Sequence, residues 1–166
     1  TAGQKYFGRY LTFVTTGLAQ STLLIGGLII YVGIEPAHPF LLFMAGGGSS
    51  LIFHLICYTL VLSLSNAGKA VGVLILVLQV SAAGGAYPLQ LLPGWAQAIS
   101  PWLPATYSIR AMRAAVFGTY DWDFWRALGI LVLFALPFLF LGLWLRHRLR
   151  HAIERMDEAV AQTKVM

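Results

Sequence analysis

Three polar side chains lie within otherwise apolar stretches of the sequence: Gln20, His54 and Gln79. Counted from the expected inner ends of their helices, each lies about 14 to 15 Å deep at 1.5 Å per residue. We expect them to form a hydrogen-bonded cluster, with Ser50 or Ser81 nearby. Polar groups inside a membrane are candidates for function. The alternative is that they only join helices, at about 0.6 kcal/mol per bond, and this is the simpler reading.

Arg110 and Arg113 form a second candidate group. They lie within residues 87–118, a segment too polar and too rich in proline to cross a bilayer. Guanidinium groups bind carboxylates and phosphates, so the pair could hold acidic headgroups or an anionic substrate at the membrane surface. The alternative is that the two side chains only extend to the interface to keep their charge in water.

Motifs of soluble enzymes are absent from the sequence. It contains no Gly-rich phosphate loop, no cluster of metal-ligating residues and no nucleophile–base pair. We therefore expect no catalysis, no metal and no cofactor, and any ATP hydrolysis would come from a separate subunit. The net charge of +5 arises from basic residues near helix ends, which fits lipid headgroups rather than nucleic acid.

The composition is that of an all-α integral membrane protein. Of 166 residues, 58% are hydrophobic and only 10% are charged, where a soluble domain carries about 25%. The apolar runs reach the length needed to cross a bilayer and do not alternate as strands would. We expect four membrane helices, and short joints at residues 35–39 and 65–68 should make the first three antiparallel neighbours. The expected helices cover residues 11–32, 40–64, 69–86 and 124–145.

Seven glycines are expected at helix contacts, because small residues let helix backbones approach closely. A sliding or hinge surface is the alternative reading. They are Gly46, Gly47, Gly48, Gly68, Gly72, Gly84 and Gly85.

Residues 87–118 are expected to form a re-entrant hairpin of two short helices at the outer membrane surface. Pro93 can open the first helix, and Ser100 should leave helical geometry because a proline follows it. Thr106 is a suitable N-cap for the second helix, and Gly118 a suitable stop. The residues assigned to this hairpin are Pro88, Pro93, Trp95, Pro101, Trp102, Pro104, Thr106, Tyr107, Arg110 and Arg113.

The distribution of basic residues predicts a cytoplasmic carboxyl terminus, because basic residues are enriched on the inner side. Residues 1–145 then form the membrane domain, and residues 146–166 form a basic, amphipathic cytoplasmic tail helix with an apolar stripe from Leu149 to Val160. Arg110, Arg113 and Arg126 are expected outside, where Trp95, Trp102, Trp122 and Trp125 form an aromatic belt. The residues expected inside are Lys5, Arg9, Lys69, Arg146, Arg148, Arg150, Arg155 and Lys164.

The run GGAYPLQLLPGWAQAISPWLPATYSIRAMR, together with the preceding SNAGKAVGVLILVLQ, resembles the C-terminal membrane region of the YhgE/Pip (phage infection protein) family. That family is similar to the type-2 ABC transporter permeases. The resemblance extends from about Lys5 to Arg146. It implies that this chain carries the last four of six membrane helices, and that the first two helices and a large ectodomain precede it in a longer protein.

The resemblance implies two alternative functions in a bacterial cytoplasmic membrane. The first is a permease-like module of an export or secretion system that moves an amphipathic or lipidic substrate as a dimer, with energy from a separate ATPase. The second is a non-transporting anchor that dimerises a large ectodomain, as in a phage receptor or a secretion-accessory protein. Docking of an ATPase on the cytoplasmic side would distinguish them.

Overall fold

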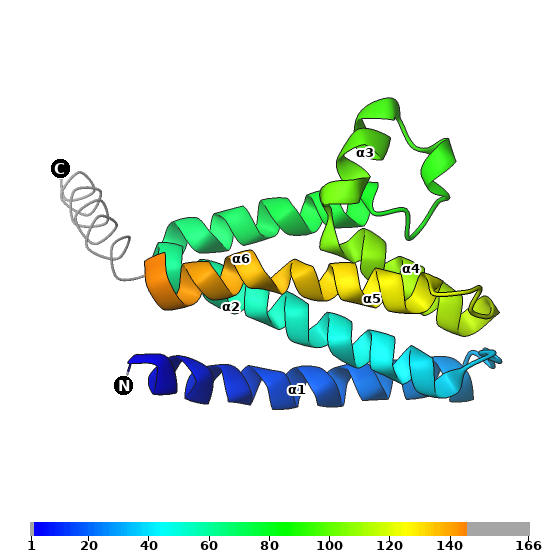
Figure 1. The fold of residues 1–166 in the computed structure, drawn as a ribbon, viewed down its shortest axis with the longest axis horizontal. Helices are drawn as coiled ribbons and strands as arrows, with labels where there is room; N and C mark the ends of the chain where they lie inside the picture. The colour runs from blue at the N-terminus through cyan, green and yellow to red at the C-terminus, as the bar shows by residue number, and fades with distance from the viewer. Residues whose placement is uncertain (1, 146–166) are drawn as a thin grey trace.

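The computed structural model describes residues 2–145, so the expected tail helix at 146–166 lies outside the described residues. The described part is helical and contains no strand. Figure 1 shows an elongated bundle in which α1, α2, α5 and α6 run along the long axis and α3 projects to one side. The α-helices are α1 (Ala2–Ile30), α2 (Pro39–Ala82), α3 (Gly94–Ile99), α4 (Pro104–Phe117), α5 (Asp123–Leu133) and α6 (Ala135–Phe140). Two 3-10 turns, Leu89–Leu91 and Ser100–Trp102, flank α3, and a π-helical turn, Leu141–Leu145, follows α6.

Helix α2 contains both the second and the third expected helices. Its helical hydrogen bonding continues through the expected joint at 65–68, but its ribbon reverses direction there, so Pro39–Leu64 and Asn66–Ala82 run side by side (Figure 1). We call these the first and second arms. The expected antiparallel arrangement is present, whereas the expected end at residue 86 is wrong. The helix stops at Ala82 because Gly84 turns the chain with a φ of 77°.

The reversal of α2 depends on Gly68. A Cβ atom at this position would overlap the carbonyl oxygen of Leu60 and lie 2.6 Å from its carbonyl carbon. Leu60 belongs to a buried cluster against which Val71 and Ile75 of the second arm pack. The close backbone approach thus brings the apolar faces of the two arms together.

The last expected helix, residues 124–145, is interrupted. Helix α5 ends at Leu133, Phe134 separates it from α6, and Pro137 lies in the first turn of α6. A proline lacks an N–H group, and its ring clashes with the carbonyl group four residues earlier, which here is that of Leu133. The break is therefore located where the proline requires it.

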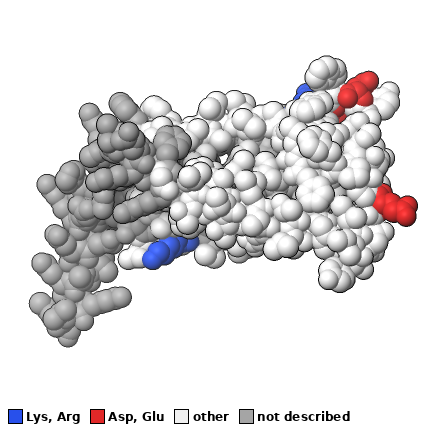
Figure 2. All heavy atoms as spheres, turned by 90° about the horizontal axis from the view of Figure 1, so that it is seen from below, with Lys and Arg blue, Asp and Glu red and all other residues white. Residues whose placement is uncertain are grey.

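Three segments are long and apolar enough to cross a membrane: Tyr10–Ile30, Pro39–Leu64 and Asp123–Leu143. The second arm of α2, Asn66–Ala82, is also apolar but covers only about 25 Å of the ~30 Å hydrocarbon core. Figure 2 shows one face of the bundle that is almost free of charge along its length, with charged side chains near its two ends. This is the surface of a membrane-embedded protein.

The first arm of α2 is the centre of the bundle. Near its end, Leu55 and Leu60 pack with Leu131 of α5 and Ala135 of α6. Near its start, a second cluster joins it to α1, α4 and α5 around the fully buried Phe124. That cluster comprises Ile25, Leu42, Ala45, Ala111, Ala115, Phe124 and Ala127.

The reversal of α2 provides a test of the fold. Gly68→Ala should lower the stability of the membrane domain by about 2 kcal/mol, because the added methyl group must displace the Leu60 backbone. The measurement is the midpoint of thermal unfolding in detergent. Gly72→Ala, in the same arm, is the control, because a Cβ there meets nothing within 4 Å. Equal midpoints for the two variants would contradict the tight reversal.

Candidate functional site

One face of helix α4 is buried in the bundle, while Arg110, Arg113 and Phe117 on its other side are exposed. Ala111 and Ala115 are completely buried against α2 and α5. The Ser108 hydroxyl shares a buried hydrogen bond of 2.6 Å with that of Ser49, whose hydroxyl also bonds to the Ala45 carbonyl. Ser49 is ten residues after the start of α2, which corresponds to about 15 Å along that helix. The middle of α4 therefore lies well inside the bundle.

The carboxyl end of α4 is joined to the connection between α1 and α2. The N–H groups of Ala37 and His38 donate to the carbonyl oxygens of Val116 and Ala115, each at 3.0 Å. Gly118 ends the helix with a φ of 109°, and its N–H donates to the Ala114 carbonyl, so the expected stop is confirmed. We call the end of the bundle that holds residues 31–38 and 118–122 the hairpin end.

The start of α4 differs from the expectation. The helix begins at Pro104 rather than after an N-cap at Thr106, whose hydroxyl instead donates to the Ser100 carbonyl at 2.7 Å and contacts the Ser100 hydroxyl at 3.0 Å. Ser100 also keeps helical geometry, with φ −48° and ψ −42°, despite Pro101 after it. Both hydroxyls are buried, and their contact holds the 3-10 turn Ser100–Trp102 against the first turn of α4.

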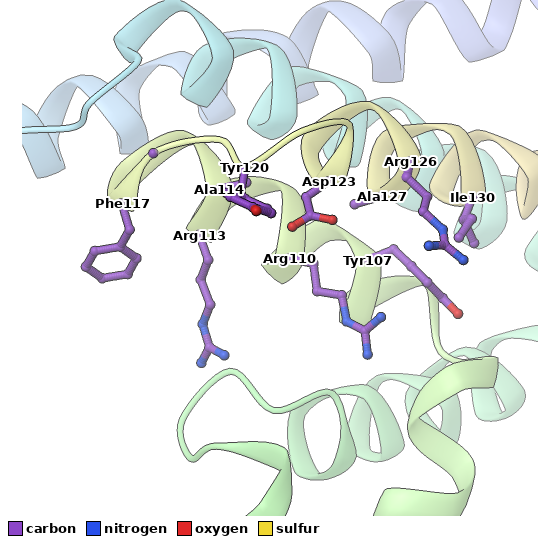
Figure 3. A pocket seen from close by; sticks show the side chains of 11 residues that line it. Tyr107, Arg110, Arg113, Ala114, Phe117, Tyr120, Asp123, Arg126, Ala127 and Ile130 are labelled. Atoms are coloured by element: carbon purple, nitrogen blue, oxygen red, sulfur yellow. The ribbon is translucent and has the colours of Figure 1, made fainter.

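A cavity of about 610 Å³ lies between α4 and α5 near the hairpin end. In Figure 3 the side chains of Arg110 and Arg113 extend from α4 on the same side as that of Arg126 from α5. The Arg110 guanidinium lies 5.5 Å from the centre of the Tyr107 ring. The Arg113 Nη2 donates to the Gly84 carbonyl oxygen at 2.8 Å, which connects α4 to the turn that follows α2.

The cavity is electropositive. Arg110, Arg113 and Arg126 contribute three positive charges to its lining and Asp123 one negative charge, which leaves a formal charge of +2. Within residues 2–145, no carboxylate forms an ion pair with any of the three guanidinium groups. The arrangement can therefore attract and hydrogen-bond an anion.

Comparison with known proteins identifies the family of this chain. The model of the family described as ABC-2 family transporter protein matches residues 4–144. The chain belongs to the ABC-2 transporter family. It is also 32% identical over 138 residues to the uncharacterized protein YhgE of Bacillus subtilis, which covers 83% of this chain and 18% of that protein. No solved structure matches the chain. The resemblance stated for the hairpin residues is thus confirmed.

In this ABC-2 protein, the segment between α2 and α4 contains the first residues assigned to the expected hairpin. Pro93 directly precedes α3 as its N-cap, and Tyr107 of α4 donates from its hydroxyl to the Pro101 carbonyl at 3.0 Å. Trp95 and Trp102 are 54% and 78% exposed. The prolines therefore divide the segment into short helical pieces as expected, while its indole rings face outward. Pro88 precedes the first of these pieces, the 3-10 turn Leu89–Leu91.

The structure does not bring Gln20, His54 and Gln79 together. Gln20 lies on the exposed face of α1. The His54 Nδ1 donates to the Ser50 carbonyl at 2.8 Å, and the ring faces Gly17 of α1. Gln79 is buried, its Oε1 has no hydrogen-bond partner, and it borders an apolar cavity of about 420 Å³ between the arms of α2. An expected common depth therefore did not predict the direction in which each side chain points.

The glycines serve different purposes in this bundle. A Cβ at Gly46 would overlap Ile25 and come within 2.9 Å of the Ser21 hydroxyl, which supports close packing of α1 on α2. Gly47 faces Leu18 at 3.4 Å and Gly48 faces Leu128 at 3.3 Å. Gly72 has open space around it, Gly84 forms a turn, and Gly85 faces Ile109 at 3.2 Å.

Three important residues were not singled out by the sequence reasoning. Gly17 was missed although a Cβ there would lie 2.6 Å from both the His54 ring and the Ser50 hydroxyl. A single glycine within an apolar helix was the available signal. No local pattern predicted the contact of Ser108 or the place of Arg126 in the cavity. The residues that each one meets are distant in sequence.

The contact between Thr106 and Ser100 provides a second test. Thr106→Val keeps the side-chain shape but leaves the Ser100 groups without this donor, so it should lower the stability of the domain by about 1 to 2 kcal/mol. The measurement is again thermal unfolding in detergent. Thr22→Val is the control, since it removes a hydroxyl that donates to the Leu18 carbonyl on an exposed face of α1. If both variants unfold at the same temperature, the Thr106 contact does not hold α4 in place.

Proposed function

We propose that this chain is the permease-like part of an export or secretion system of the YhgE type. In this proposal it moves an amphipathic or lipidic substrate with energy from a separate ATPase. Membership of the ABC-2 transporter family supports the permease role. The observation that carries it is the position of α4, a helix that lies deep in the bundle and borders a cationic cavity.

The depth of α4 supports a re-entrant hairpin. Its first turns contact the middle of two long helices, since Ser108 bonds to Ser49 of α2 and the Tyr107 ring lies 5.8 Å from that of Phe134, just after α5. Each contact is about 15 to 16 Å along its helix from the hairpin end. In this reading α4 begins near the membrane centre and runs outward. Backbone at that depth must be buried in protein, and Pro104, Thr106 and Ser108 at the start of α4 are buried.

The proposed topology has four crossings, with the second arm of α2 as the short third crossing. The arm ends at the Gly84 turn, whose carbonyl group accepts from Arg113. The hairpin end faces outward and the carboxyl terminus is cytoplasmic, in the bacterial cytoplasmic membrane, because the positive-inside tendency favours the end that carries Lys5, Arg9 and Lys69.

The proposed assembly is a homo- or heterodimer embedded in the lipid bilayer, with the ATPase on the cytoplasmic side. The chain works with the two further helices and the ectodomain that the YhgE/Pip resemblance implies. The alternative is a membrane anchor that dimerises the ectodomain without transport. The two proposals differ in one respect that can be measured, since only a permease requires α4 and α2 to separate during its cycle.

A disulfide across α4 and α2 tests the proposal. The hydroxyl oxygens of Ser49 and Ser108 are 2.6 Å apart, so cysteines at both positions are close enough to be joined. We expect that oxidation of Ser49→Cys/Ser108→Cys, in a Cys57→Ala background, abolishes ATP-dependent movement of fluorescent phosphatidylglycerol. The assay uses inverted membrane vesicles from cells that produce the full protein, and reduction should restore the movement.

The controls are the two single-cysteine variants, which should keep full activity after oxidation. Vesicles without the protein give the background rate. ATP-dependent movement that does not exceed this background would contradict the permease proposal and favour the anchor. Full movement with the disulfide formed would show that α4 stays fixed during transport.

A further inference from the structure

We infer that the cavity lined by Arg110, Arg113 and Arg126 is a binding site for the phosphate group of an anionic amphiphile. This inference rests on the proposed function, because it identifies the class of substrate that the module takes up. Its first support is charge. The lining carries a formal charge of +2, and none of the three guanidinium groups has a carboxylate partner within the described residues.

The guanidinium groups of Arg110 and Arg113 each contact another group of the chain without any ligand. Arg113 uses Nη2 to bond the Gly84 carbonyl, which fixes the side chain and leaves its other N–H groups free. Arg110 lies over the Tyr107 ring, and Tyr107 is itself held by the Pro101 carbonyl. A pre-organised site loses less conformational entropy when it binds. The two arginines of α4 are therefore more than side chains that extend freely into water.

The third guanidinium belongs to a different helix. Arg126 lies in the first turn of α5, across the cavity from α4, and its side chain has no described protein partner. Groups from two helices can contact one ligand from two directions. Guanidinium groups match phosphate oxygens in bidentate geometry, and a phosphate offers more acceptor oxygens than a carboxylate, so three arginines favour a phosphate.

The remaining lining indicates that the ligand is amphipathic. Ile130, Ala127 and Phe117 give the cavity an apolar side next to its guanidinium groups. Trp122 and Tyr120 are 76% and 77% exposed near the hairpin end, where aromatic side chains mark the boundary between hydrocarbon and water. A ligand with its phosphate at the arginines and its apolar part along α5 would match both chemistries.

The test measures binding and not transport. The full protein in detergent is titrated with fluorescent phosphatidylglycerol, which carries a net negative charge, and with fluorescent phosphatidylcholine, which does not. We expect tighter binding of phosphatidylglycerol, about tenfold weaker binding in Arg126→Gln, and a smaller loss in Arg126→Lys. Asp123→Asn should strengthen binding because it removes the opposing charge.

Lys69→Gln is the matched control, because it removes one positive charge from an exposed site at the other end of the bundle. Competition identifies the source of the phosphate. Displacement by micromolar inorganic phosphate or glycerol 3-phosphate would support a soluble phosphate ester, and resistance to both would support a lipid headgroup. Equal affinity for the two lipids, or equal binding by Arg126→Gln and Lys69→Gln, would overturn the inference.

The outcomes separate this inference from the proposed function. Loss of ATP-dependent movement with selective phosphatidylglycerol binding intact would contradict only the permease proposal. ATP-dependent movement that is unchanged in Arg126→Gln, together with unselective lipid binding, would contradict only the phosphate site. Each result is obtained in a separate assay on the same protein.

Discussion

The structure depends on one constraint, that backbone polar groups inside hydrocarbon must find partners within the protein. Two sets of hydrogen bonds satisfy the backbone of helix α4. Its own hydrogen bonds satisfy the interior of the helix, and the N–H groups of Ala37 and His38 satisfy carbonyl groups at its end. These two hydrogen bonds therefore satisfy the carboxyl end of α4 and also attach the connection between α1 and α2 to it. Without them, the carbonyl groups of Ala115 and Val116 would lose these two N–H partners.

Small residues allow this arrangement to pack. Ala45, Ala111 and Ala115 are completely buried where α4 meets the first arm of α2, and Gly46 permits α1 to approach the other side of that arm. In a membrane, helices associate through close packing rather than through exclusion of water, so small side chains at contacts contribute directly to stability. The larger buried residues, Phe124 and Leu131, fill the space left along α5.

Packing also explains the position of the cavity. Ala111 and Ala115 of α4 pack against α2 and α5, whereas Tyr107, Arg110 and Arg113 of the same helix line the cavity. Arg126 in the first turn of α5 reaches the same space. The charged cavity is thus a consequence of which face of α4 is buried.

Local sequence predicted much of the fold. Apolar runs predicted the long helices and Gly118 predicted the end of α4, because each depends on the chemistry of a few neighbouring residues. The expectation failed for Thr106 and Ser100, because the Thr106 hydroxyl donates to the Ser100 carbonyl, six residues earlier, instead of capping α4.

The sequence by itself determined that this is a helical membrane protein of the ABC-2 family, because length, apolarity and the proline-spaced hairpin are local properties. The tertiary structure alone decided which polar groups meet. Gln20, His54 and Gln79 were expected at one depth, yet they face three different surroundings, whereas Arg126 joins Arg110 and Arg113 across two helices. The physical reason is that depth follows from position along a helix, while direction follows from how each helix is rotated by its packing.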